Sequence, residues 1–113
     1  MDRGDLLLAP FPYSDLRGLK RRPVCVVSSV AHSQGPDVIV AMVTSSSARM
    51  TQPGIGDVVL EDWRAAGLRQ PSVVRAGRLL VVEHRLLAGP LGRLSSRDLT
   101  AVDEGLKVAL GLQ

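Results

Sequence analysis

The stretch KRRPVCVVSS, residues 20–29, places three cationic side chains directly before a proline and a short apolar run. The cations are Lys20, Arg21 and Arg22, and the apolar run that follows is typical of a buried strand. A guanidinium presents several N–H donors in a fixed fork that matches phosphate oxygens. Two of the 14 Lys and Arg residues are lysine, which leaves twelve arginines. This bias is compatible with an RNA or DNA partner, and a GC-rich genome is the plainer explanation for it.

The composition predicts one globular domain that spans residues 1–113. The chain has 113 residues, a mass of 12.1 kDa, 45% hydrophobic residues and a mean hydropathy of +0.15. Its net charge is +3 and its pI about 9.8. No apolar run approaches the ~18 residues of a membrane span, and no secretory signal is recognisable. The lone Cys25 lies between two valines and is interpreted as a buried apolar residue without a disulfide role. We therefore expect a cytoplasmic protein with no membrane partner.

The order of apolar runs and turn signals predicts short strands followed by one terminal helix. Strands are expected at 4–12, 23–29, 38–45 and 57–60, and two more on either side of Gly77, at 72–77 and 78–84. The continuous apolar run at 38–45 indicates a strand buried on both faces. Residues 61–68 favour about two helical turns ended by Gly67. Residues 94–112 favour a helix capped by Ser95 or Ser96. This pattern is typical of a small barrel or two-sheet β domain with helical decoration.

Three short motifs lie in a specific order along these elements. Gly4-Asp5 opens the first strand, Arg22-Pro23 opens the second, and Thr44-Ser45 closes the third. With the flanking runs GDLLLAPFPYSDLRGLKRRPVCVVSS, VIVAMVTSS and DVVLEDWRAAGLRQPSVVRAGRLLVVEHRLL, they make the chain resemble the MazF/PemK family of bacterial toxins over roughly residues 3 to 112.

The resemblance implies a fold, an activity and partners. The expected fold is mainly β with helices, an SH3-like small barrel with a C-terminal helix, assembled as a homodimer. The expected activity is that of an endoribonuclease in a type II toxin–antitoxin system, which needs no metal and no other cofactor. Such an enzyme cuts single-stranded RNA and leaves 2′,3′-cyclic phosphate and 5′-OH ends. The expected protein partner is a cognate antitoxin with an acidic, disordered C-terminal segment, which suits a basic RNA groove.

By the same resemblance, the family's functional arginine falls on Arg22 and its functional threonine on Thr44. Attack by the 2′-OH passes through a phosphorane whose extra negative charge a preorganised guanidinium can hold. Pro23 restricts the backbone of Arg22 to an extended conformation, and the Thr44 hydroxyl can donate to the same phosphate. Without the resemblance, Arg22 would be read as a solvated charge and Thr44 as an ordinary strand residue.

Further RNA contacts are expected from residues near these two. Lys20 and Arg21 suit the RNA backbone, with plain surface exposure as the alternative. Tyr13 is expected to stack on a base, and Phe11 is as consistent with a core position as with stacking. Ser45 and Ser46 are expected to offer hydroxyl groups to RNA, although serines after a strand are also typical of a loop. Arg78 stands where a polar glutamine is expected, which predicts an altered base preference.

The two histidines, His32 and His84, would be an acid–base couple in another ribonuclease. Neither aligns with a catalytic position of the family, and both are interpreted as bystanders. The group that takes the 2′-OH proton is left open between a backbone group, a water molecule and a transiently deprotonated arginine. Three alternative functions also stay open: a gyrase-poisoning toxin of the same fold, a non-enzymatic RNA-binding module, and a member that has lost its activity.

Overall fold

The computed structural model describes residues 1–12 and 19–113, and side chains for residues 1–10 and 20–113. Tyr13, which is expected to stack on a base, and the side chain of Phe11, which is expected either to stack or to belong to the core, therefore lie outside the described part. The described elements follow the order β1 Asp5–Pro12, β2 Leu19–Val26, α1 Val30–Ser33, β3 Asp37–Thr44, α2 Ser47–Thr51, β4 Asp57–Val59, β5 Val73–Glu83, the 3₁₀ turn η1 His84–Leu86, β6 Ala88–Arg93 and α3 Ser96–Leu110.

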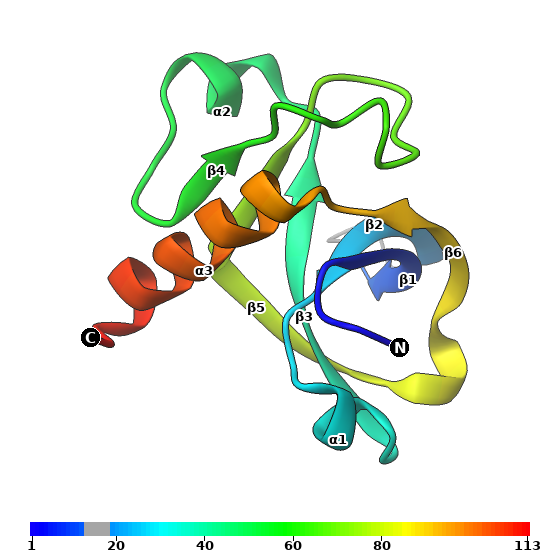
Figure 1. The fold of residues 1–113 in the computed structure, drawn as a ribbon. Coiled ribbons are helices and arrows are strands. Elements are labelled where there is room, and N and C mark those ends of the chain that lie inside the picture. Colours follow the sequence, from blue (N-terminus) through cyan, green and yellow to red (C-terminus); the bar gives the residue numbers. More distant parts are fainter. Residues whose placement is uncertain (13–18) are drawn as a thin grey trace.

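The six described strands form one antiparallel sheet in the order β4-β5-β3-β2-β1-β6, whose hydrogen bonding does not close into a ring. The helix α3 lies across β4 and β5, with α1 and α2 at opposite ends of the molecule (Figure 1). The predicted fold class, mainly β with a C-terminal helix, is confirmed. The helix begins as predicted, because the Ser95 hydroxyl accepts a hydrogen bond from the backbone N–H of Asp98.

Several element predictions differ from the structure. The second strand begins at Leu19 rather than at Pro23, so the cationic cluster lies within β2 and not before it. The predicted helix at 61–68 is a series of bends and turns. The strand candidates around Gly77 are one strand, β5, which bulges: Ala41 pairs with Leu79 but the next residue, Met42, pairs with Arg75. The strand β6 was not predicted, because its sequence AGPLGR has two glycines and a proline.

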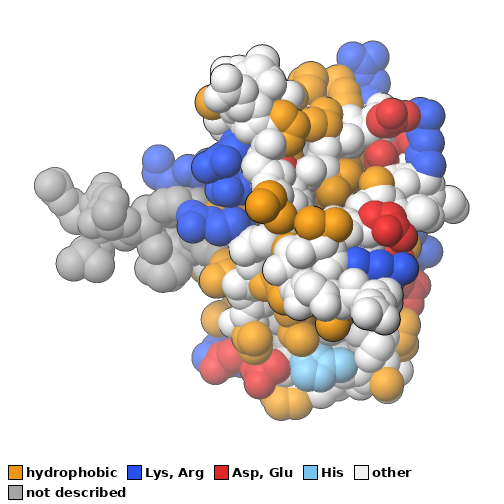
Figure 2. Space-filling model, turned by 90° about the vertical axis from the view of Figure 1, so that its left-hand side faces the viewer, with side chains coloured by type: hydrophobic (Ala, Val, Ile, Leu, Met, Phe, Trp, Pro, Cys, Tyr) orange, Lys and Arg blue, Asp and Glu red, His pale blue; other side chains and the backbone are white. Residues whose placement is uncertain are grey.

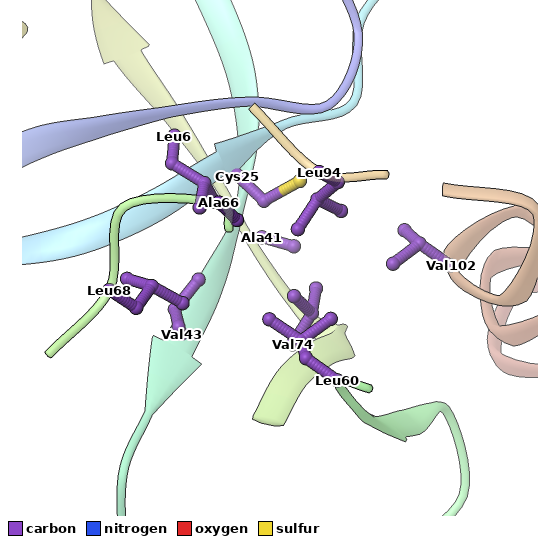
Figure 3. Close-up of a cluster of buried hydrophobic side chains, with 10 residues drawn as sticks. All are labelled: Leu6, Cys25, Ala41, Val43, Leu60, Ala66, Leu68, Val74, Leu94 and Val102. Atoms are coloured by element: carbon purple, nitrogen blue, oxygen red, sulfur yellow. The ribbon is translucent and has the colours of Figure 1, made fainter. Parts of the chain in front are cut away.

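The strands β1 to β3 bury both faces, as predicted for the third strand. One face contributes to a core that α3 covers, and the other to a second core that β5 helps to enclose. Figure 3 shows the first core, where side chains from several strands and loops converge with Val102 of α3: Leu6, Cys25, Ala41, Val43, Leu60, Ala66, Leu68, Val74 and Leu94. Burial raises the pKa of the Cys25 thiol to about 12. Cys25 is therefore a packing residue, as the sequence analysis expected.

The segment between β4 and β5 reaches across to β6 by a close backbone contact. A Cβ atom at Gly67 would lie 2.3 Å from the Leu91 carbonyl oxygen, and one at Gly92 would lie 2.0 Å from the Ala66 carbonyl oxygen. Since both obstacles are backbone atoms, no side-chain movement could make room. The two glycines therefore allow the segment to rest directly on β6.

The same segment is also held by the first turn of α3. The carboxylate of Asp98, 2% exposed, accepts hydrogen bonds from the backbone N–H groups of Glu61 and Asp62 at 3.0 and 2.8 Å. Asp62 in turn receives two hydrogen bonds from the Arg97 guanidinium, both 2.7 Å, and one from the Ser95 hydroxyl at 2.6 Å. These bonds join residues 61 and 62 to the start of α3.

The close contact at β6 predicts that Gly92→Ala destabilises the protein. The added methyl group meets backbone that cannot yield, and overpacking of this kind costs about 1–3 kcal/mol. Gly92 has no positive φ, so a lower free energy of unfolding in Gly92→Ala would come from the close contact and not from backbone strain. Denaturant unfolding gives the measurement. Gly54→Ala is the matched control, because its Cβ would come no closer than 3.4 Å to Asp57 Oδ2. Equal stability of the Gly92→Ala variant and the wild type would contradict the contact.

The bonds around Asp62 predict a pH-dependent contribution to stability. Hydrogen bonds from Arg97 and then Ser95 hold the pKa of Asp62 below its usual range. A lowered folded-state pKa stabilises the protein above the unfolded pKa of about 4, and this contribution is lost as the pH falls through the folded-state value. Asp62→Asn should therefore melt below the wild type at neutral pH, and the difference should narrow below about pH 4. Glu104→Gln is the control. If the melting temperature of Asp62→Asn lies below that of the wild type by the same amount at neutral pH and below about pH 4, the prediction is wrong.

Candidate active site

A pocket of about 330 Å³ lies where β1, β2 and β3 meet the segment that precedes β5. Its apolar lining consists of Leu8, Pro23, Val43, Leu68 and Leu91. Its polar lining consists of Arg22, Thr44, Ser45, Arg69, Gln70 and Ser72. The pocket therefore combines an apolar interior with hydrogen-bonding groups, the usual composition of a ligand site.

Arg22 reaches the pocket from a rigid part of β2. It pairs with Ala9 of β1, and the next residue, Pro23, pairs with Leu8. The pairing of β2 with β3 extends only from Val26 to Val24, where it stops beside a proline that has no N–H to donate. Arg22 is exposed, and at this position β2 is paired with β1 and is past the end of its pairing with β3.

Thr44 is the last residue of β3 and lines the same pocket. The β2–β3 register pairs Val24 with Met42, so two further residues along each strand bring Arg22 level with Thr44. The Thr44 Oγ1 accepts a hydrogen bond from the backbone N–H of Ser46 at 3.2 Å. This bond orients the hydroxyl and leaves its own hydrogen to be donated to a ligand.

The other residues predicted from the sequence are only partly brought together here. Ser45 lines the pocket, whereas Ser46 contributes its backbone N–H to Thr44. Lys20 and Arg21 are exposed on β2 beside Arg22 and do not line the pocket. Arg78 is exposed in the bulge of β5 and is also not part of the lining.

Two pocket residues were missed by the sequence analysis. Arg69 and Gln70 lie in the segment that was predicted to be a helix and its exit, about 25 residues after Thr44 in the chain. The sequence carried a weak signal for them, because GLRQPS places a cation and an amide between a glycine and a proline.

Cations with and without carboxylate partners both occur among the described residues. Among the described residues, six arginines form ion pairs with carboxylates: Arg3, Arg49, Arg75, Arg85, Arg93 and Arg97. No carboxylate within the described ranges pairs with Lys20, Arg21 or Arg69, which lie on or next to the pocket, or with Arg64 and Arg78, which do not line it. Figure 2 shows Lys and Arg side chains on both sides of the face in view; those at the right lie beside Asp and Glu, whereas a group at the middle of the left side does not. This part of the surface therefore suits a polyanion.

Neither histidine belongs to the pocket. His32 is exposed in α1, and His84 lies in the turn after β5 against Asp37, Glu83 and Arg85. No carboxylate is found in the described pocket lining. Residues 1–12 and 19–113 contain no group of three or more His, Cys, Asp and Glu side chains placed to hold a metal ion. Across those same residues, no helix has the length and apolar character that a membrane crossing requires.

The fold has many counterparts among solved structures. An "Endoribonuclease in complex with its cognate antitoxin from Mycobacterial species" has a TM-score of 0.82 and 19% identity, with 100% of this chain and 97% of that chain covered. The "Mycobacterium tuberculosis toxin MazF-mt6" has a TM-score of 0.77 and 22% identity, with 96% and 98% covered. A MazE–MazF structure from Deinococcus radiodurans has a TM-score of 0.78 and 24% identity, with 100% and 98% covered. These likenesses concern the fold.

A search of curated proteins found no match. A family model, described as "PemK-like, MazF-like toxin of type II toxin-antitoxin system", matches residues 2–110. The match covers all six strands and α3, and with it the pocket residues Arg22 and Thr44. The chain therefore belongs to the PemK-like, MazF-like toxins of type II toxin–antitoxin systems.

Proposed function

We propose that the protein is a metal-independent endoribonuclease that cuts single-stranded RNA at the pocket of Arg22 and Thr44. The observation that carries this proposal is that these two residues, from two strands, line one pocket. On or next to this pocket lie Lys20, Arg21 and Arg69, which have no carboxylate partner in the described ranges. Membership of a family known for endoribonucleases supports it. A polyanion with a reactive 2′-OH is the ligand that this combination suits.

The proposed reaction is transesterification within the RNA. The 2′-oxygen forms a bond to phosphorus, and the bond from phosphorus to the 5′-oxygen breaks. The 2′-OH loses its proton and the departing 5′-oxygen gains one, which gives a 2′,3′-cyclic phosphate and a 5′-OH. Arg22 donates hydrogen bonds to the phosphorane oxygens, and Thr44 adds its hydroxyl hydrogen. The Arg22 backbone is paired within the sheet and the Thr44 oxygen is held by the Ser46 N–H, and donors held in place in this way lower a barrier.

The neighbouring residues have a separate role in this proposal. Lys20 and Arg21 extend along β2 from Arg22 and are exposed, so they contact phosphates next to the one that reacts. Ser45 offers its hydroxyl at the pocket, and Ser46 holds Thr44 through its backbone. Arg78, on the bulge of β5, contacts RNA farther along the surface. Tyr13 keeps its proposed stacking role, although it lies outside the described residues.

We also propose a homodimer and an antitoxin partner in the cytoplasm. Two of the similar structures contain an antitoxin, and exposed apolar side chains on this chain leave surface for a second protein: Ile55, Val81, Val108, Leu110 and Leu112. Sedimentation at micromolar concentration should give about twice 12.1 kDa. A monomer that cuts RNA at full rate would contradict the dimer.

Substitution of the two central residues should separate catalysis from binding. Arg22→Ala should lower the single-turnover rate at saturating enzyme by about 10²–10³-fold, the usual loss for one preorganised donor. Arg22→Lys should restore little, because a point charge lacks the guanidinium fork. Thr44→Val should also lose rate, since it keeps the shape and removes the hydroxyl. The measurement is cleavage of a long RNA in EDTA, with thermal melts to confirm folding.

Lys20→Ala and Arg21→Ala are the matched controls for Arg22→Ala. Each removes an exposed cation next to Arg22, so each should weaken RNA binding and reduce the salt dependence of that binding. The single-turnover cleavage rate at saturating enzyme should stay near that of the wild type. A wild-type rate for Arg22→Ala at saturation would show that Arg22 only binds RNA. Protection of RNA without cuts by the wild type would favour a binding module, and trapped gyrase cleavage would favour the gyrase-poisoning alternative.

The antitoxin proposal predicts competition at the same surface. A disordered acidic segment that folds on the cationic pocket mimics the RNA polyanion, so it should block cleavage. The partner expressed from the adjacent reading frame should bind this protein, and its isolated C-terminal segment should raise the apparent dissociation constant for RNA. Added salt should weaken that inhibition. Cleavage that is unchanged at saturating antitoxin would contradict the proposal.

A further inference from the structure

The segment of residues 60–72 forms a wall of the pocket that is distant in sequence from Arg22 and Thr44. It contributes Gly67, Leu68, Arg69, Gln70 and Ser72 to the lining. Figure 1 shows this segment, between β4 and β5, at the end of the molecule opposite to α1. The pocket therefore has an arginine and an amide that the proposed chemistry does not use.

The backbone that carries these two side chains is held on both sides. Before them, Gly67 rests on the Leu91 carbonyl, and the Leu68 N–H donates to the Trp63 carbonyl at 3.1 Å. After them, the hydroxyl of Ser72, which is 4% exposed, donates to the Gln70 carbonyl at 2.8 Å. The Ser72 carbonyl accepts from the Leu60 N–H at 3.0 Å. Arg69 and Gln70 thus project from fixed positions, which is what selective recognition requires.

The side chains themselves are exposed and unused. Across residues 1–12 and 19–113, neither the Arg69 guanidinium nor the Gln70 amide has a hydrogen bond or an ion pair. A glutamine amide offers a donor and an acceptor side by side, the pattern that pairs with the edge of a nucleobase. An arginine beside it can contact the phosphate of the same nucleotide or stack on the base.

The size and apolar lining of the pocket match one base. Its volume of about 330 Å³ is near the lower end of the ~300–1,000 Å³ of small-ligand sites. Leu8, Pro23 and Leu91 offer apolar surface to the flat faces of a base, while Gln70 and Ser45 offer polar groups to its edge. A single unstacked nucleotide fits this combination, whereas a paired duplex would have its base edges occupied.

We propose that Gln70 and Arg69 form a base-selecting subsite, in which one unstacked base beside the scissile phosphate enters this pocket. Gln70 hydrogen-bonds the edge of that base and sets which base is accepted, while Arg69 contacts the adjoining phosphate. This subsite rests on the proposed function, because it names how the RNA cut at Arg22 and Thr44 is chosen.

The test of Gln70 is the base preference of cleavage. A pool of RNAs with random bases around the cut is digested by the wild type and by Gln70→Ala, and the new ends are sequenced. We expect Gln70→Ala to lower the preference for the favoured base about tenfold at one position next to the cut, and to leave the other positions unchanged. Gln34→Ala, at the exposed end of α1, is the matched control and should cut like the wild type.

The test of Arg69 is the salt dependence of binding. Arg69→Ala should weaken binding about equally for all sequences and reduce the slope of log K against log salt by about one. The matched control is Arg64→Ala, an exposed arginine of the same segment that lies 5.0 Å from the Trp63 ring centroid and does not line the pocket. An unchanged slope for Arg69→Ala overturns its part of the subsite.

The outcomes distinguish this subsite from the proposed function. Wild-type base preference in a folded Gln70→Ala variant overturns the subsite and leaves the roles of Arg22 and Thr44 intact. Effects of Gln70→Ala and Arg69→Ala on antitoxin affinity alone, with RNA unaffected, would also overturn it. If the wild type makes no cuts, the proposed cleavage is wrong; the same pool selected by binding then tests the subsite, and an unshifted preference in Gln70→Ala overturns it.

Discussion

The pocket and part of the first core depend on the contact between Ala66-Gly67 and Leu91-Gly92. The sheet ends with β4 at one edge and β6 at the other, and its hydrogen bonds do not join these edges. The segment after β4 crosses to β6 instead, where two glycines allow the backbones to meet. This crossing covers the first core with Ala66 and Leu68, and it completes the pocket. A backbone contact at two glycines thus connects the segment after β4 to β6, although no strand pairing connects the two edges of the sheet.

The pocket is built from two kinds of support that suit two kinds of task. Arg22 and Thr44 stand on β2 and β3, and these paired strands suit the fixed donors that the proposed reaction needs. Arg69 and Gln70 stand on a loop, which is held by Gly67, Ser72 and the start of α3. Since loop residues change without disturbing a sheet, relatives with this fold can vary the loop while keeping the strands. The proposed cleavage and the proposed base selection are therefore separable in this architecture.

The carboxylates of the chain explain where its positive charge is available. Asp57, Asp62 and Asp103 are engaged by arginines on the body of the molecule, and Asp98 is buried against backbone N–H groups. In the described part of the chain, these acidic groups are engaged in ion pairs and hydrogen bonds, and the pocket lining has none. A small net charge of +3 becomes a local cationic surface because the two signs are separated in space.

The sequence by itself determined the strands with strong apolar runs, the capped helix α3, the family resemblance and the pairing of Arg22 with Thr44 as candidates. The strands and the helix follow from local patterns, which are the side-chain period and a serine cap, whereas Arg22 and Thr44 follow from the resemblance, which rests on the order and spacing of short motifs. Only the tertiary structure decided that residues 61–68 form turns, that AGPLGR is a strand, and that Arg69 and Gln70 join the pocket. Each of these depends on contacts between distant segments, since Gly67 needs Gly92, and β6 needs the free edge of β1. Local propensity carries no information about such contacts, so this part of the site became visible only in the folded chain.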